Sequence, residues 1–232
     1  MSYTSLAYRL PKRLKRLVLH FETAILDAVE RFAAKLPERE LVLDAGAGEG
    51  QYCAHFKKVR YVGVDLGVGD AAWNYGQLDA ICDLNALPFS TAVFGAALNV
   101  VTLEHLRDPQ VALSEISRVL RSGAELLLVA PHEWEVHQSP HDYFRYTRHG
   151  LELLLQRAGF GEVRIEPVGG YFRLLARRLL NGLQFFTGGA RWILFIPAAA
   201  VLIPPALILP LLDGLDTQKN FTLGYICTAR KR

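Results

Sequence analysis

Acidic residues close short apolar runs at three successive places in the first half of the chain. These residues are Asp44, Asp65 and Asp83. If the runs are parallel strands of one sheet, their carboxyl ends share an edge, and the three carboxylates lie near one another. There, Asp65 could accept hydrogen bonds from both hydroxyls of a ribose, and Asp83 could accept one from an adenine amino group. We therefore expect a ligand that contains ribose and adenine.

A glycine-rich turn, Asp44-Ala-Gly46-Ala-Gly48-Glu-Gly50, follows the first of these runs. Glycine permits unusual backbone dihedrals and lets a ligand lie against bare backbone. We expect a helix to begin after the turn and to offer free N–H groups. The spacing D-x-G-x-G-x-G differs from the G-x-G-x-x-G of dinucleotide sites. Asp44 would repel a pyrophosphate but could hold an ammonium group through local structure or water, which disfavours a dinucleotide or nucleotide-sugar enzyme.

The order of these segments resembles the class I S-adenosylmethionine-dependent methyltransferases, especially the small-molecule group that includes quinone-biosynthesis enzymes. The resemblance runs from about residue 41 to 161 and returns near 221–230; its matching segments are 43–50, 62–65, 83–89, 103–109 and 115–120. It implies S-adenosylmethionine as cofactor, with the glycines near the methionine portion, Asp65 at the ribose, Asp83 at the adenine and Asn99 beside the sulfonium. The expected cofactor-binding residues are Asp44, Gly46, Ala47, Gly48, Gly50, Asp65, Leu66, Asp83, Leu84 and Asn99. Two departures are Gly95, where the family commonly has an acid, and residues 121–124, which replace a Pro-Gly-Gly turn.

The acceptor side is expected in the loop from residue 131 to 147, which is dense in histidine, acid, tyrosine and arginine. It also resembles the H-x-x-P-x-D-Y-x-R-x-T segment of bacterial family members encoded for polysaccharide or lipid modification. His137 or His141 would remove a proton from an acceptor hydroxyl, and Asp142 would orient that imidazole. The expected substrate contacts are Glu104, His105, Tyr143 and Arg145, the last holding an anionic group.

Structural roles for the same loop residues remain open. Asp142 and Thr147 could cap helices, and the tyrosines could pack beneath the loop. We expect no metal, because His132, Glu133, His137 and His141 do not form a standard zinc motif.

The elements that position these residues alternate between strand and helix patterns. We expect strands at residues 41–43, 61–64, up to 83, 94–100, 125–130, 163–168 and 222–229, and helices at 11–36, 109–121 and 147–158. The alternation predicts an α/β fold with a Rossmann-like, doubly wound sheet of seven mostly parallel strands, the last antiparallel. One domain would comprise a basic helical segment (1–37), a cofactor-binding core (38–170), a hydrophobic insertion (171–219) and a final strand (220–232).

The insertion contains an uncharged stretch from residue 192 to 212 that is long enough for a transmembrane helix. Four prolines interrupt it, and each removes a backbone donor. Because the strands on either side must pair in one sheet, the stretch has to return to the side it left. We therefore expect a re-entrant or interfacial hairpin, with a homodimer interface or a second core as the alternative. Anionic headgroups would meet the nearby basic residues Arg9, Lys12, Arg13, Lys15, Arg16, Arg173, Arg177, Arg178 and Arg191.

Composition limits the classes of partner and the cellular compartment that the protein can have. The net charge of +3 is mild, and no N-P-P-Y-type loop follows residue 99, so we expect no nucleic-acid partner. Three scattered cysteines suit a reducing compartment, and the N-terminus lacks a signal-peptide pattern. We expect a cytoplasmic enzyme, peripheral on the cytosolic face of the membrane, that methylates a small-molecule or lipid-linked acceptor at oxygen. The alternative is an inactive methyltransferase-fold binding or scaffold protein at a membrane.

Overall fold

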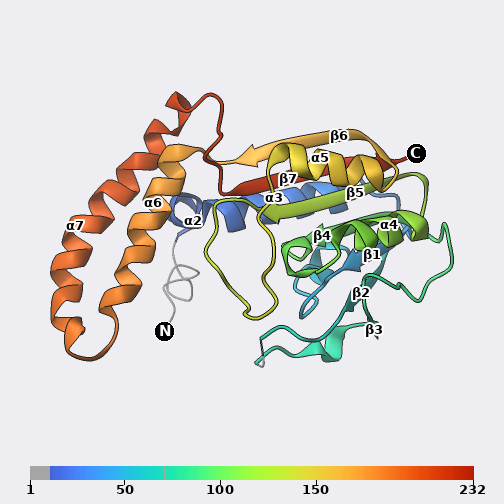
Figure 1. Ribbon diagram of the computed structural model, residues 1–232, viewed down its shortest axis with the longest axis horizontal. Helices are drawn as coiled ribbons and strands as arrows, with labels where there is room; N and C mark the ends of the chain where they lie inside the picture. The colour runs from blue at the N-terminus through green and yellow to red at the C-terminus, as the bar shows by residue number, and fades with distance from the viewer. Residues whose placement is uncertain (1–10, 71) are drawn as a thin grey trace. The chain divides into compact units, whose positions relative to one another are not determined.

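The computed structural model describes residues 11–70 and 72–232 (Figure 1). Of the basic residues near the N-terminus, Arg9 lies outside this part, and the side chains of Lys12 and Arg13 are not described. The described chain divides into two compact units, one of residues up to 24 and 167–224, and one of residues 25–166 and 225–232. We call them the helical unit and the sheet unit.

In the described residues, the sheet has seven strands in the order β3-β2-β1-β4-β5-β7-β6. The strands are β1 (Leu41–Ala45), β2 (Arg60–Asp65), β3 (Ala80–Ile81), β4 (Phe94–Val100), β5 (Leu120–Pro131), β6 (Phe160–Val168) and β7 (Gly224–Lys231). Pairs β1–β2, β1–β4, β2–β3 and β4–β5 are parallel. The β7 arrow runs opposite to its neighbours β5 and β6 (Figure 1). This topology confirms the predicted Rossmann-like sheet.

Helices α4 (Pro109–Val119) and α5 (Arg148–Arg157) cover one face of the sheet (Figure 1). Apolar side chains on their inner faces, among them Leu113, Ile116 and Leu151, are fully buried in one cluster with the strands. Strand β5 is buried at every position from Leu126 to Pro131, as expected for a central strand covered on both faces. The opposite face is covered by α3 (His20–Lys35), whose Phe32 is 2% exposed.

Several predicted boundaries were wrong by a few residues. The predicted helix at 11–36 is broken into α2 (Lys12–Val18) and α3, because Leu19 between them has non-helical dihedrals of φ −111° and ψ 53°. Strand β3 has only two residues, and β7 begins two residues later than predicted. Short 3-10 helices complete the chain: η1 (Cys53–His55), η2 (Tyr75–Gln77), η3 (Leu103–His105), η4 (Leu183–Phe186), η5 (Gly189–Leu194) and η6 (Leu209–Leu215).

The helical unit contains α6 (Tyr171–Gly182), which is packed against α7 (Phe195–Ile208) as a hairpin. Ala176, Leu180, Leu183 and Ala206 form its small core. The backbone N–H groups that begin α6 donate to two acids at the end of the insertion: Gly170 N to Asp213, and Tyr171 N to Asp216. Negative charge at a helix N-terminus is favourable, so these acids stabilise the return of the chain after the hairpin.

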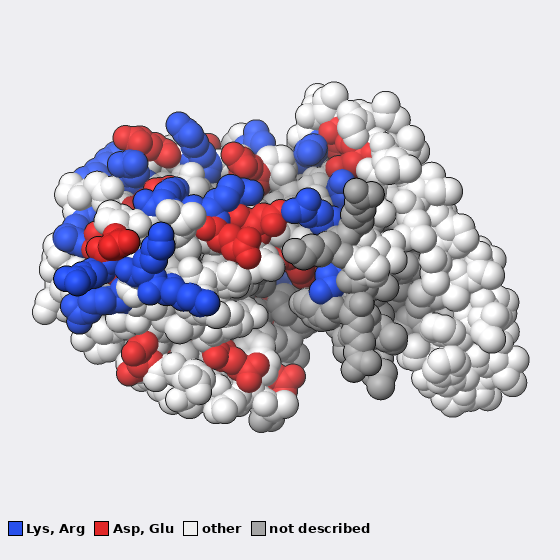
Figure 2. Space-filling model, turned by 180° about the vertical axis from the view of Figure 1, so that it is seen from behind, with Lys and Arg blue, Asp and Glu red and all other residues white. Residues whose placement is uncertain are grey.

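The helical stretch Gly189–Leu215 is apolar and exposed. Its most apolar window has a mean hydropathy of 2.3 and is 6% buried, and by length and composition it is the one helix in the described chain that could cross a membrane. Helix α7 continues through Pro204 and Pro205, so these two prolines do not interrupt the helix, although interruption was expected. Figure 2 shows that the surface of this hairpin is largely free of charged side chains on the face in view, whereas the sheet unit carries both signs.

Candidate cofactor and acceptor site

The glycine-rich turn is built from β1 and held by its neighbours. Gly46 N and Ala47 N donate to Val64 O of β2, and Thr102 Oγ1 donates to Gly46 O at 3.0 Å. Gly46, Gly48 and Gly50 all have positive φ, of 92°, 56° and 75°. The expectation of a helix after the turn was wrong, because within the described residues only the three-residue η1 lies between β1 and β2. The N–H groups of Gly46, Ala47 and Gly50 donate to backbone carbonyls, and that of Gly48 donates to Asp65, so these four are not the free N–H groups that were expected for a ligand.

Asp65 joins the glycine-rich turn to the end of β2. One carboxylate oxygen accepts from Gly48 N at 3.0 Å, and the other accepts from Gly67 N at 2.9 Å. Each oxygen keeps a second lone pair, so the carboxylate can still accept from the two hydroxyls of a ribose. The side chain of Leu66, next in the chain, is 48% exposed and offers an apolar surface beside it. This donor and acceptor set fits an adenosine-containing cofactor.

The remaining predicted cofactor-binding residues differ in how accessible their side chains are to a ligand. Asp83 is exposed and accepts from Asn85 N at 2.8 Å. Leu84 is 3% exposed, and its side chain belongs to the core, so only its backbone can face a ligand. Asn99 is fully buried, and its amide donates to Ala45 O at 2.7 Å. Asn99 therefore joins β4 to the end of β1 from inside the sheet.

Asp44 lies inside the protein rather than on the turn surface. It is 1% exposed, and Tyr61 Oη donates to its Oδ2. Burial raises the pKa of this carboxyl to about 7. An ammonium group would have to be reached through the surrounding structure, as the sequence suggested, because direct access is closed.

Sequence reasoning did not single out two aromatic residues near the glycine-rich turn, Trp73 and Tyr75. Their rings form an edge contact with centroids 6.2 Å apart, and Tyr75 Oη accepts from Gly69 N. A Cβ added at Gly48 would lie 3.3 Å from the Trp73 ring. Only their position eight and ten residues after Asp65 could have drawn attention to them.

The acceptor loop, residues 132–147, is fastened to η3 by several hydrogen bonds. Tyr143 N and Phe144 N donate to Glu104 O at 2.9 and 3.3 Å, and Tyr146 Oη donates to Leu103 O at 2.9 Å. His105 Nδ1 bonds to His141 O. These contacts join segments that are more than 35 residues apart in sequence, and they bring the predicted groups of both segments together.

At the centre of this arrangement lies Glu104, whose side chain is fully buried. Its Oε1 is 3.7 Å from His105 Nε2 and 3.9 Å from His137 Nε2. The two imidazoles meet edge to face, with ring centroids 4.8 Å apart. Burial raises the pKa of Glu104 to about 8 and lowers that of His105. The groups predicted as a base and as substrate contacts therefore form one cluster.

Asp142 and Arg145 form an ion pair next to His137 of this cluster. The Arg145 guanidinium binds both oxygens of Asp142, at 2.6 and 2.7 Å, and this ion pair lowers the pKa of Asp142 to about 2. Asp142 also accepts from His137 N at 2.8 Å and lies 3.5 Å from His137 Nδ1. The Asp142 side chain is thus within reach of His137, and its role in orienting that imidazole stays a prediction. Arg145 is engaged by this carboxylate, and its role as a substrate anchor stays a prediction.

His141 lies at the edge of the cluster, with Nδ1 3.2 Å from Tyr143 Oη. Tyr143 in turn accepts from Arg107 Nε at 3.1 Å and is 37% exposed. Of the two histidines considered as a base, His137 therefore has the buried carboxylate neighbour, and His141 faces exposed partners.

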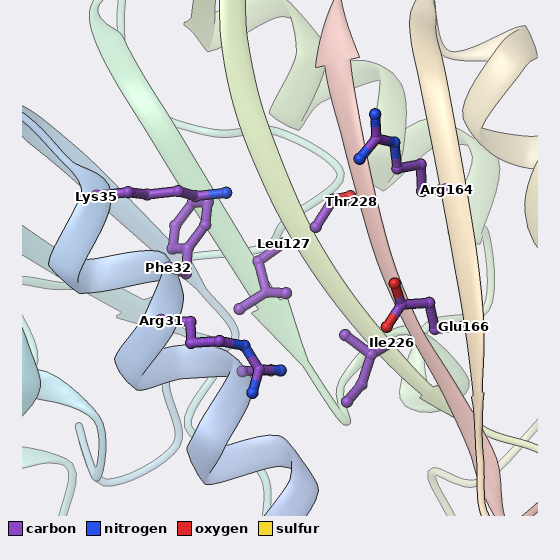
Figure 3. A pocket seen from close by; sticks show the side chains of 9 residues that line it. Arg31, Phe32, Lys35, Leu127, Arg164, Glu166, Ile226 and Thr228 are labelled. Carbon is purple, nitrogen blue, oxygen red and sulfur yellow. The ribbon is translucent and has the colours of Figure 1, made fainter.

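A separate cavity of about 140 Å³ lies between α3 and the sheet. Figure 3 shows Arg31, Phe32 and Lys35 of α3 on one side, facing strands β5, β7 and β6; the lining there includes Leu127, Ile226, Thr228, Arg164 and Glu166. None of the predicted site residues lines this cavity. It is on the other face of the sheet from α4 and α5 and does not belong to the site described above.

Comparison with known proteins relates part of this chain to methyltransferases. Residues 43–128 match the model of a family described as a methyltransferase domain. Over 114 residues the chain is 32% identical to a malonyl-[acyl-carrier protein] O-methyltransferase of Herminiimonas arsenicoxydans, covering 47% of this chain and 44% of the relative. Over 102 residues it is 29% identical to tRNA (carboxymethyluridine(34)-5-O)-methyltransferase alkbh8 of Xenopus tropicalis, covering 42% of this chain and 16% of the relative. The matches thus span less than half of these relatives.

A solved structure extends the likeness to nearly the whole chain. The 1,6-didemethyltoxoflavin-N1-methyltransferase of Burkholderia thailandensis, bound to 1,6-didemethyltoxoflavin and S-adenosylhomocysteine, superposes with a TM-score of 0.53 at 19% identity. The alignment covers 99% of this chain and 88% of that chain, and at this identity it shows the shared fold.

Residues 43–128 are therefore similar to a methyltransferase domain, and this match, together with the shared fold, supports S-adenosylmethionine as the cofactor. This agrees with the methyltransferase family and the cofactor expected from the sequence. The closer resemblance to quinone-biosynthesis enzymes is not specifically supported and stays a prediction.

Proposed function

We propose that this protein transfers a methyl group from S-adenosylmethionine to an oxygen atom of a small or lipid-linked acceptor at a membrane surface. The observation that carries the proposal is the cluster of Glu104, His105 and His137. Glu104 and His105 follow the end of β4 within the segment that matches a methyltransferase domain, and His137 joins them from the acceptor loop. Methyl transfer is a displacement, so it needs an aligned acceptor and, for a hydroxyl, a base. His137, backed by Asp142, supplies that base.

Oxygen is favoured as the methylated atom by two observations. Both curated relatives named above are described as O-methyltransferases. The acceptor loop also brings basic imidazole nitrogens and a carboxylate to one place, which suits removal of a hydroxyl proton or positioning of a carboxyl group. One of these relatives is named for a tRNA, which makes RNA an acceptor that any assay must include.

The proposed membrane contact rests on the hairpin of the helical unit. Ile193, Ile196 and Val201 are 81%, 76% and 70% exposed, and residues 192–212 carry no charge. Leaving this much apolar surface in water costs free energy, whereas burying it in the acyl region of a bilayer recovers it. Trp192, 54% exposed at the start of the stretch, is a residue type enriched at bilayer interfaces.

One part of the expected headgroup contact was wrong. Arg177 is 5% exposed and donates to Glu22 Oε1 at 2.9 Å, so its charge is used inside the helical unit. Arg173 lies 3.4 Å from Asp213. The proposal therefore relies on the apolar surface of the hairpin, with Arg191 at its beginning, rather than on a basic cluster.

The experiment is to incubate the full chain with methyl-tritiated S-adenosylmethionine and a total cell extract, and then to separate lipid, aqueous small-molecule and nucleic-acid fractions. The proposal expects label in the lipid or small-molecule fraction. Alkaline hydrolysis then tells a methyl ester from an ether. His137→Ala should lose the label, whereas His149→Ala, at an exposed position of α5, should retain it.

Other outcomes decide against the proposal. Label only in the nucleic-acid fraction would identify an RNA methyltransferase. Binding of S-adenosylhomocysteine without labelling of any fraction would favour the alternative, an inactive binding or scaffold protein at a membrane.

A further inference from the structure

The Glu104 cluster has an unusual shortage of hydrogen-bond donors. Within the described part of the chain, neither carboxylate oxygen of Glu104 has a hydrogen-bond partner, although the side chain is fully buried. His105 Nε2 is likewise buried without a partner. A buried carboxylate left in this state is strongly unfavourable unless a cation or a proton compensates it.

The tautomers of both histidines follow from their other contacts. His105 Nδ1 faces His141 O, and a carbonyl oxygen can only accept, so Nδ1 carries the proton. His137 Nδ1 has two acceptors, Glu135 O at 3.1 Å and Asp142 Oδ2 at 3.5 Å, against one donor, Arg145 Nη2 at 3.4 Å. The balance again places the proton on Nδ1. Both Nε2 atoms therefore present lone pairs to the same carboxylate.

Three groups with lone pairs thus converge on one point. The ligand atoms of Glu104, His105 and His137 all lie within 4.8 Å of one another. Around a metal at about 2.1 Å from each ligand, such atoms stand roughly 3 to 3.5 Å apart, so closure by about an ångström is needed. The 3-10 turn η3 holds two of the ligands, and the acceptor loop, which brings His137, can supply this movement.

The surroundings resemble the outer shell of a metal site in their chemistry. Metal-ligating histidines commonly donate their second ring N–H to a backbone carbonyl or a carboxylate, which fixes the tautomer and the ring orientation. Here His105 donates to His141 O, while His137 has Glu135 O and Asp142 as acceptors. Arg145 then holds Asp142 in place.

We propose that Glu104, His105 and His137 form a binding site for a divalent transition-metal ion. Two imidazoles and one carboxylate suit Zn²⁺, Mn²⁺ or Fe²⁺ better than Mg²⁺ or Ca²⁺, which prefer oxygen ligands. Three protein ligands leave at least one position open, where an acceptor oxygen can bind and be polarised. In the metal-bound state His137 would therefore act as a ligand, and the ion, rather than the imidazole, would promote loss of the acceptor proton. This role in catalysis rests on the proposed oxygen methylation, whereas metal binding itself does not. No metal was expected from the sequence, because the four residues considered there, His132, Glu133, His137 and His141, share only His137 with this set.

The test uses the full chain in mild detergent after removal of metals by chelation and dialysis. Titration with Zn²⁺ by calorimetry and with Co²⁺ by visible absorption should show one ion per chain. Glu104→Gln and His137→Ala should each weaken binding at least tenfold, and His149→Ala should bind like the wild type. Glu104→Gln keeps the shape of the side chain, and thermal unfolding of each variant checks that it folds.

Binding of S-adenosylhomocysteine, measured in the same samples, separates this proposal from the proposed function. A wild-type chain that binds S-adenosylhomocysteine but no metal would overturn the metal site and leave a protonated Glu104 as the compensating group. A chain that binds the metal but not S-adenosylhomocysteine would retain the metal site and contradict methyl transfer. Equal metal binding by Glu104→Gln and the wild type would also overturn the site.

Discussion

The sheet unit and the helical unit differ in which side chains they bury and which they expose. At the site of the sheet unit, polar side chains such as Glu104 and Asp44 are withdrawn from water, and neighbouring groups orient them. In the helical unit, Ile193 and Ile196 are left almost fully exposed. Removing a carboxylate from water without a partner costs free energy, and so does leaving an isoleucine exposed to water. Each therefore indicates a missing partner. For the first we infer a small ligand, and for the second a lipid surface.

The largest expected effect is on the glycine-rich turn of the sheet unit. A Cβ at Gly46 would lie 2.2 Å from the Thr102 side chain, so Gly46→Val should abolish S-adenosylhomocysteine binding, with a loss of at least 100-fold measured by calorimetry. Gly123→Ala is the matched control, because Gly123 also has positive φ but no atom within 4 Å of its added Cβ. That control should cost only about 1 kcal/mol of stability. Normal binding by Gly46→Val would remove this turn from the cofactor site.

The buried acid of β1 predicts a pH dependence in the sheet unit. The folded-state pKa of Asp44 is raised from 3.8 to about 7, so the folded protein retains a proton that the unfolded chain has lost. This contribution to stability is present below pH 4 and is lost as the pH rises towards 7. Asp44→Asn should remove the dependence and gain up to about 4 kcal/mol relative to wild type between pH 4 and pH 8. Denaturant unfolding at both pH values measures it, and an unchanged difference would contradict the burial effect.

Charged substitutions in the hairpin of the helical unit should weaken binding to vesicles, whereas charged substitutions on the sheet unit should not. Replacing Ile193 and Ile196 together by Asp should lower partition into phosphatidylcholine–phosphatidylglycerol vesicles about 100-fold, because each isoleucine contributes roughly 1.5 kcal/mol or more on burial. Leu153→Asp, at a 47% exposed leucine of α5, is the control and should leave partition unchanged. A wild-type chain that stays monomeric and soluble without detergent would contradict membrane contact, and a stable detergent-free dimer would favour a second copy of the chain.

The smallest expected effect tests a local structural role next to the acceptor loop. Thr147 Oγ1 accepts from Gly150 N at 3.1 Å and caps α5. Thr147→Ala should lower the free energy of unfolding by about 1 kcal/mol without changing cofactor affinity. Ser114→Ala in α4, whose hydroxyl only donates to Gln110 O, should change it by less than about 0.5 kcal/mol. A loss of cofactor affinity in Thr147→Ala would show that the cap also positions the site.

Sequence patterns predicted the sheet unit more completely than the site within it. The bounds of β4 were predicted as observed, because a buried parallel strand is a continuous apolar run. The segments that resemble the methyltransferase family also indicated Asp65 and the three glycines as candidate cofactor-binding residues. The break at Leu19 and the two-residue β3 were missed, because apolar spacing continues through both and does not report local dihedrals.

The grouping of Glu104, His105 and His137 could not be read from spacing. These residues lie on two segments that meet only when the loop from 132 to 147 folds back onto η3. Each of the three was named as a candidate in the sequence, but their common point depends on hydrogen bonds to backbone carbonyls. The ion pair between Arg145 and Asp142 could not be predicted for the same reason. The two residues are three positions apart in a loop whose conformation no sequence pattern specifies.

The central claim is that the carboxyl edge of the sheet binds S-adenosylmethionine through Asp65. The most direct measurement is calorimetric titration of the detergent-solubilised full chain with S-adenosylhomocysteine and, in parallel, NAD, using Asp65→Ala and the exposed-loop control Asp70→Ala. We predict saturable binding of S-adenosylhomocysteine alone, retained in Asp70→Ala and reduced at least 100-fold in Asp65→Ala, since two charge-assisted hydrogen bonds are lost. Absence of binding by the folded wild-type chain, or equal affinity in Asp65→Ala, would contradict the account.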